Sequence, residues 1–66
     1  MTEIQQYDRV RIVTSRFEDL GVSAGMRGYV VETYPDGELE IEISDSTNGE
    51  TIALFAARPA DVELDA

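Results

Sequence analysis

The sequence predicts an all-β fold, a small and strongly bent barrel of five short strands. Residues 25–32 combine a G-x-x-G turn with a run of β-branched side chains, and residues 38–43 alternate strictly between glutamate and an apolar residue. Between them, Pro35-Asp36-Gly37 has the composition of a tight turn. Together these features predict a β-hairpin. With 66 residues, the chain has room for a single domain, residues 1–66, around one small core.

The first strand is expected over residues 7–13. Val10 and Ile12 would face the core and Arg9 and Arg11 the outer surface, because successive side chains of a strand point to opposite faces. A long connection over residues 14–26 follows. We expect its apolar side chains to fold over one open end of the barrel, namely those of Phe17, Leu20 and Val22.

The turn at residues 35–37 predicts how the second strand, residues 27–34, pairs with the third, residues 38–44. Proline presets φ for the first central position of a type I turn, and Gly37 takes the left-handed bulge position, so that Tyr34 pairs with Glu38. A two-residue turn would instead direct a glutamate at the core, at a cost of several kcal/mol. The bulged turn is therefore preferred.

Counting back from this pair assigns the two faces of the hairpin. Val31 is expected opposite Ile41, and Tyr29 opposite Ile43, with these four side chains and Leu39 in the core. The same register places Glu32 beside Glu40, with Glu42 two residues further on. We expect an acidic strip on the outer face, which is the predicted partner-binding surface, made of Glu32, Tyr34, Glu40 and Glu42.

The fourth strand is expected over residues 50–56, after a polar connection that turns at Asn48-Gly49. Ile52 and Leu54 are expected to supply its core contacts. Residues 58–61 then predict a 3₁₀ turn before a short last strand over residues 62–64. We expect residues 1–6 and 65–66 to be loosely ordered.

Charge limits the classes of partner. Fourteen acidic residues stand against five basic ones, all of them arginines, and the formal net charge is -9. Nucleic acid and anionic membranes are therefore not expected as partners, because binding to phosphate relies on cationic side chains. The acidity is explained either by solubility alone or by a surface that meets a basic partner protein.

The composition also argues against catalysis. The chain has no cysteine, histidine or lysine, so disulfides, thiolate or imidazole metal ligands and the common pairs of nucleophile and base are absent. Glu32, Glu40 and Glu42 offer oxygen ligands, but carboxylates spread over two flat strands do not converge readily on a cation. Residues 45–50 lack the acidic spacing of a calcium loop and are expected to be a turn. We expect no enzyme activity, no cofactor and no metal.

The first residues predict the compartment. Residues 1–6 contain neither a basic region nor an apolar run, so that no secretory signal is expected. No stretch approaches the roughly 20 apolar residues that span a membrane. We expect a soluble cytoplasmic protein.

Several short patterns point to a family. Residues 7–10 read Y-D-x-V, residues 25–32 read G-x-x-G-x-V-V-E, and residues 40–43, 48–51 and 61–64 add E-I-E-I, N-G-x-T and D-V-x-L. This series resembles a family of short uncharacterised bacterial domains that look like SH3-like barrels with a KOW-type turn. The resemblance implies a five-stranded SH3-like barrel with a long first loop and a 3₁₀ turn before the last strand, and it implies no catalytic residues. We expect structural turns at Gly25, Gly28, Pro35, Asp36 and Gly37.

The function expected from these observations is that of a non-enzymatic acidic module that binds a basic protein, as an accessory subunit, a regulator, or an immunity or antitoxin-type partner. Two alternatives stay open. A KOW-type module would recruit to RNA or ribosomes through the turn at Gly25 and Gly28, and a small structural subunit would belong to a larger enzyme. A homo-oligomer is a further expectation if Ala53 and Phe55, in an apolar stretch, are not covered within the chain.

Overall fold

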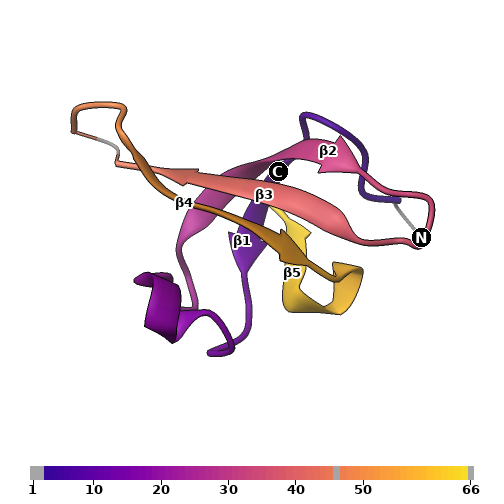
Figure 1. Ribbon diagram of the computed structural model, residues 1–66, viewed down its shortest axis with the longest axis horizontal. Coiled ribbons are helices and arrows are strands. Elements are labelled where there is room, and N and C mark those ends of the chain that lie inside the picture. The colour runs from indigo at the N-terminus through magenta and orange to yellow at the C-terminus, as the bar shows by residue number, and fades with distance from the viewer. Residues whose placement is uncertain (1–2, 46, 66) are drawn as a thin grey trace.

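The computed structural model describes residues 3–45 and 47–65, which form one antiparallel sheet of five strands in the order β4-β3-β2-β1-β5 (Figure 1). Its two ends are β4 and β5, so the hydrogen-bonded ladder does not close into a barrel. The all-β prediction is confirmed, and the described residues contain no α-helix. The elements are β1 (Arg9–Ile12), η1 (Glu18–Leu20), β2 (Arg27–Thr33), β3 (Leu39–Ser44), β4 (Thr51–Ala57), η2 (Pro59–Asp61) and β5 (Val62–Leu64), where η denotes a 3₁₀ helix.

The first strand is shorter than predicted. Val10 and Ile12 are buried and Arg9 and Arg11 lie on the outer face, as the alternation predicts. The strand begins only at Arg9 because the chain before it turns: Asp8 donates its N–H to the carbonyl of Gln5 at 3.1 Å. β1 pairs with β2 on one side and with β5 on the other.

The turn between β2 and β3 has the predicted geometry. Tyr34 donates its N–H to the Glu38 carbonyl at 2.9 Å, and Gly37 donates to the Tyr34 carbonyl at 3.0 Å. Gly37 has a φ of 91°, a left-handed conformation that only glycine adopts without strain. The carboxylate of Asp36 accepts the N–H of Glu38 at 3.0 Å, which further holds the turn. Gly25, in the turn before β2, donates its N–H to the Ile12 carbonyl at 2.7 Å.

The predicted register beyond Glu32 is wrong, because β2 contains a β-bulge between Val30 and Glu32. Val30 rather than Val31 lies opposite Ile41 and is fully buried, and Tyr29 lies opposite Glu42 instead of Ile43 and is 49% exposed. One extra residue reverses the direction of every side chain that precedes it in the strand.

Gly28 gives the physical reason for this bulge. The shifted register turns Gly28 towards the core, where β2 and β3 approach so closely that a Cβ would collide with the Glu42 carbonyl and lie 2.6 Å from Ile43 Cδ1. No larger residue fits this position. With the predicted register, Tyr29 would have had to enter the core near Ile43 instead.

The predicted inner face of β4 is also wrong. Ile52 and Leu54 are exposed, whereas Phe55 and Ala57 are buried. Phe55 lies opposite Ile41 and packs against Phe17, with the two ring centroids 4.5 Å apart. The aromatic ring buries more apolar surface than Leu54 would, which favours this face.

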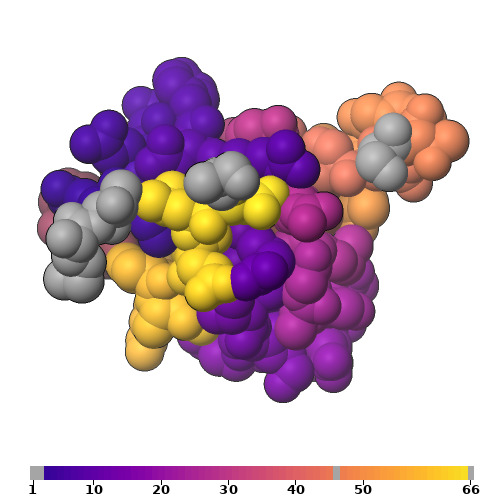
Figure 2. Space-filling view, turned by 180° about the vertical axis from the view of Figure 1, so that it is seen from behind, coloured from indigo at the N-terminus to yellow at the C-terminus, as the bar shows by residue number. Residues whose placement is uncertain are grey.

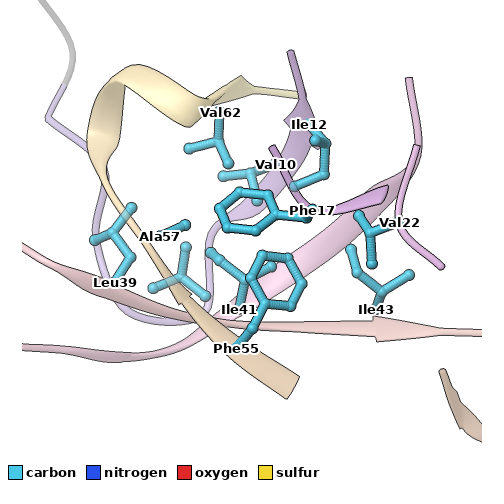
Figure 3. Packing of buried hydrophobic residues seen from close by; sticks show 11 residues of the cluster. Val10, Ile12, Phe17, Val22, Leu39, Ile41, Ile43, Phe55, Ala57 and Val62 are labelled. Atoms are coloured by element: carbon cyan, nitrogen blue, oxygen red, sulfur yellow. The ribbon is translucent and has the colours of Figure 1, made fainter. Parts of the chain in front are cut away.

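The long connection between β1 and β2 covers the core as expected, except at Leu20. Phe17 and Val22 are buried, and Val22 donates its N–H to the Phe17 carbonyl at 3.2 Å across the short η1 helix. Leu20, within η1, is 50% exposed, and η1 has no buried residue. Figure 3 shows Phe17 and Phe55 side by side among the other core residues. The core consists of Val10, Ile12, Phe17, Val22, Val30, Leu39, Ile41, Ile43, Phe55, Ala57 and Val62.

The last part of the chain follows the prediction, with a 3₁₀ helix at Pro59–Asp61 and a short strand at Val62–Leu64. Asp65 donates its N–H to the Arg9 carbonyl at 3.0 Å. Residues 1, 2 and 66, for which we expected loose order, lie outside the described residues, and so does residue 46 of the polar connection. Figure 2 shows the connection between β3 and β4, in orange, projecting from the rest of the molecule. Nowhere in residues 3–45 and 47–65 does a helix have the length and apolarity to cross a membrane.

Candidate functional site

The acidic strip lies on the outer face of β2 and β3, as predicted. Glu32 is directly opposite Glu40 in the antiparallel register. The Tyr34 hydroxyl donates to Glu40 Oε2 at 3.5 Å, a long contact at the limit of a hydrogen bond. Glu32 and Tyr34 are exposed, and Glu40 is half-buried. This end of the strip therefore gathers two carboxylates and a phenol.

Glu42 is held in a different way from the other carboxylates of the strip. It lies opposite Tyr29 on one side and Leu54 on the other. Its two oxygens accept hydroxyl hydrogen bonds, from Ser44 Oγ at 3.3 Å and from Thr51 Oγ1 at 3.4 Å. Glu42 is thus partly satisfied within the sheet, and its carboxylate is less available than those of Glu32 and Glu40.

Glu38 belongs to the same surface, although the strip predicted from sequence did not include it. Its half-buried side chain follows the turn, and its backbone pairs with Tyr34. The signal was present in the sequence, because the predicted turn already placed Glu38 opposite Tyr34. We call Glu32, Tyr34, Glu38 and Glu40 the acidic cluster.

The negative charge of this cluster affects the pKa of Tyr34. Partial desolvation, followed by the negative charges of Glu40 and Glu32, raises the pKa of the Tyr34 phenol above its ordinary 10.0. The hydrogen bond to Glu40 and the charge of Glu38 act in the same direction. An anionic phenolate beside three carboxylates would be repelled, so Tyr34 stays a neutral hydrogen-bond donor at physiological pH.

Four of the five arginines form ion pairs with carboxylates near the C-terminal strand β5, namely those of Asp61, Glu63 and Asp65. Asp65 Oδ2 is 3.0 Å from Arg9 Nε and 2.9 Å from Arg27 Nε, and Arg11 forms an ion pair with Glu63. Arg16 pairs with Asp61. Within residues 3–45 and 47–65, no arginine forms an ion pair with a carboxylate of the acidic cluster. These ion pairs neutralise four of the five arginines, and the acidic cluster is left negative.

An open cavity of about 800 Å³ adjoins the acidic cluster. Tyr34 and Glu38 line it together with the apolar side chains of Ile4, Leu39 and Pro59. The lining of the cavity thus combines apolar side chains with the carboxylates of Glu3 and Glu38. Such a surface accepts an apolar side chain that is followed or preceded by a cation.

Other predicted features carry less chemistry. In the part of the chain that the structure describes, no three carboxylates are grouped so that they could hold a metal ion. A second cavity of about 470 Å³ lies beside the turn at Gly25 and is lined by Arg9 and Arg27, whose guanidinium groups already contact Asp65. In the polar connection, Thr47 donates its N–H to Asp45 Oδ1 and Asp45 donates its N–H to the Glu50 carbonyl, both at 2.7 Å.

Comparison of the chain with protein-family models, with curated proteins and with solved structures yields no match. The function is therefore inferred from the geometry and charge of the acidic cluster alone.

Proposed function

We propose that this protein is a non-enzymatic binding module whose acidic cluster binds a basic segment of a partner protein, and that it acts as an accessory subunit or regulator of that partner. An immunity or antitoxin-type role is one form of such regulation. The module has no chemistry of its own in this proposal, because its functional groups are carboxylates and a neutral phenol.

The pairing of Glu32 with Glu40 carries the proposal. Like charges directly opposite each other on antiparallel strands destabilise a sheet, and no arginine of the described chain forms an ion pair with either carboxylate. A lysine or arginine from a partner would remove this repulsion on binding. The free energy of binding would thus include relief of a cost that the free protein bears.

Tyr34 and the adjoining cavity support a protein as the partner. A tyrosine presents an apolar ring and a hydrogen-bonding hydroxyl, a combination that is enriched at protein interfaces. Tyr34 lines the cavity together with Glu38 and with the apolar residues Leu39 and Pro59. We therefore infer that the bound segment carries an apolar side chain next to its basic residues.

The fold that we propose for this module is SH3-like, of the kind that the family resemblance implies. The strand order β4-β3-β2-β1-β5 and the 3₁₀ helix directly before β5 support this assignment. SH3 domains bind extended peptides on tyrosine-lined surfaces, which agrees with a peptide-like partner segment at Tyr34.

A pair of charge-matched variants tests the proposed function. The double variant E32Q/E40Q removes two charges from the acidic cluster, and E18Q/D19N removes two from η1, on a different part of the chain. Tagged wild-type protein and both variants are used to capture partners from host lysate at low and high salt, and both protein and nucleic acid are identified. The partner is then purified and titrated directly with each variant.

The expected result is a basic protein that binds wild type and E18Q/D19N, is lost with E32Q/E40Q, and dissociates at high salt. Equal binding to both variants would contradict the role of the cluster. Capture of RNA or ribosomal proteins with a steep salt dependence would favour the KOW-type alternative. A single large enzyme in fixed stoichiometry, insensitive to salt, would favour a structural subunit.

A further inference from the structure

We propose that two copies of this chain associate edge to edge through antiparallel pairing of their β4 strands, with a two-fold axis at Leu54. The proposal rests on the backbone and side chains of β4 and is independent of the acidic cluster. It concerns the outer edge of the strand, which has no neighbouring strand in the part of the chain that the structure describes.

The two edges of the sheet differ in how they are protected. β5 has only three residues, and its Glu63 forms an ion pair with Arg11. β4 has seven residues, Thr51–Ala57, with neither a charge nor a proline among them. Native proteins keep exposed edges from pairing by making them short, charged or bulged. β5 is short and charged, whereas the bulge in the pairing of β4 lies at its start, near Ser44, and leaves residues 53–57 regular.

The backbone N–H and C=O groups at the outer edge of β4 can pair with another strand. Because Glu38 bonds to Tyr34 in β2, the alternation of the ladder directs the groups of Leu39, Ile41 and Ile43 towards β4. Their partners in β4 are Ala57, Phe55 and Ala53. The N–H and C=O groups of Leu54 and Ala56 therefore point away from β3, to the free edge.

The side chains of this edge are self-complementary. Leu54 is 60% exposed and Ile52 is 42% exposed, whereas Ala56, also exposed, is small. In a symmetric antiparallel pair centred on Leu54, the two copies of Leu54 face each other and exchange two hydrogen bonds. Ile52 of each copy comes to lie near Ala56 of the other. The large side chains are thus covered and no charge is buried.

The distribution of charge around β4 favours a second copy of this chain over a basic strand as the partner of this edge. A basic strand added to β4 would find no carboxylate on its immediate neighbour. Two copies, by contrast, bring uncharged strands together and keep their acids apart. Glu42 lies opposite Leu54, so the Glu42 rows of the copies would be separated by three strand spacings, roughly 14 Å. This exceeds the screening length of about 8 Å at physiological salt.

Dimerisation through β4 and binding of a basic partner should respond to salt in opposite directions. The dimer should tighten as salt rises, because salt screens the repulsion between two chains of net charge -9 while the contact at Leu54 is apolar. Binding of a basic partner to the acidic cluster should weaken under the same conditions. The E32Q/E40Q variant should leave dimerisation by β4 in place.

Analytical ultracentrifugation of the whole chain from micromolar to millimolar concentration measures the association. The test variant is Leu54→Lys, which places a lysine, the residue with which native proteins block edges, on the two-fold axis. Leu20→Lys is the matched control, because Leu20 is similarly exposed but lies in η1. The wild type and Leu20→Lys should dimerise alike, and Leu54→Lys should dimerise at least about tenfold more weakly, because like charges would face each other.

Amide hydrogen exchange of the wild type gives a readout that needs no variant. The N–H groups of Leu54 and Ala56 should become protected as the concentration rises through the dimerisation range. A protein that stays monomeric at millimolar concentration would overturn the proposal, as would a dimer that Leu54→Lys leaves unchanged or in which the Leu54 amide still exchanges freely. A monomer whose binding of another protein is abolished by Leu54→Lys would overturn it in favour of a different occupant of this edge.

Discussion

Arg16 donates hydrogen bonds from Nη1 to both carboxylate oxygens of Asp61, at 2.9 and 2.7 Å, across 45 positions of the sequence. Asp61 is 5% exposed and also accepts the N–H of Arg58 at 2.9 Å. One carboxylate therefore joins the long connection after β1 to the start of η2. The Arg16 guanidinium carbon lies 5.1 Å from the centre of the Phe17 ring, which places this ion pair at the border of the core.

Asp61→Ala should destabilise the fold by about 2–3 kcal/mol, because it removes the partner of Arg16 and leaves the Arg58 N–H without its acceptor. Urea unfolding followed by circular dichroism measures the change. Glu63→Ala is the matched control, since it breaks the exposed ion pair with Arg11 and should cost less than about 1 kcal/mol. A cost for Asp61→Ala no larger than that for Glu63→Ala would contradict the bridging role of Asp61.

Gly28→Ala should cost about 2 kcal/mol or more, because the added Cβ would collide with the Glu42 carbonyl and with Ile43. Gly21→Ala is the comparison: its Cβ would meet open space, and only the strain of a φ of 80° would remain, about 1 kcal/mol. Thermal unfolding of both variants measures which substitution destabilises the protein more. If Gly21→Ala proved the more damaging of the two, the close approach of β2 and β3 at Gly28 would be refuted.

Glu40→Gln should stabilise the free protein by a few tenths of a kcal/mol at low salt, because it relieves the repulsion from Glu32 across the strands. The gain should shrink as salt rises, since the carboxylates are at the surface. Urea unfolding at two salt concentrations measures it, with Glu18→Gln as a control for the change in net charge. A loss of stability at low salt would contradict a dominant repulsion between Glu32 and Glu40.

The phenol of Tyr34 should titrate above pH 10.0, because partial desolvation and the charges of Glu40 and Glu32 raise its pKa. The raised pKa means that the folded chain holds this proton more tightly than the unfolded chain does. Its contribution to stability is therefore intact below pH 10.0 and is lost as the pH rises through the folded-state pKa.

Ultraviolet absorbance of the phenolate measures this titration. The Tyr34 component, identified by its loss in Tyr34→Phe, should move to lower pH with Glu40→Gln. A titration that Glu40→Gln does not move would show that the carboxylate of Glu40 is too distant to act on the phenol.

The candidate surface was largely predictable because it lies next to the turn. Gly37 and Pro35 fix where β2 reverses into β3, and the ladder between this turn and Glu32 is regular. Pairs counted over this short distance, such as Glu32 with Glu40, are therefore correct. The arginine partners were not predictable, because Arg16 and Asp61 meet only when the long connection folds back over the sheet.

Local sequence is enough to predict the all-β class, the turn at Gly37, the alternation in β1 and the acidic face beside the turn, because each depends on the conformational preferences of residues close together in the chain. Which residues of β2 and β4 face inwards depends instead on long-range packing. Val30 and Val31 are chemically identical, and β4 is apolar on both faces, so that no local preference distinguishes the alternatives. Close packing at Gly28 and the contact of Phe55 with Phe17 decide them, and both involve strands and loops that meet only in the folded protein.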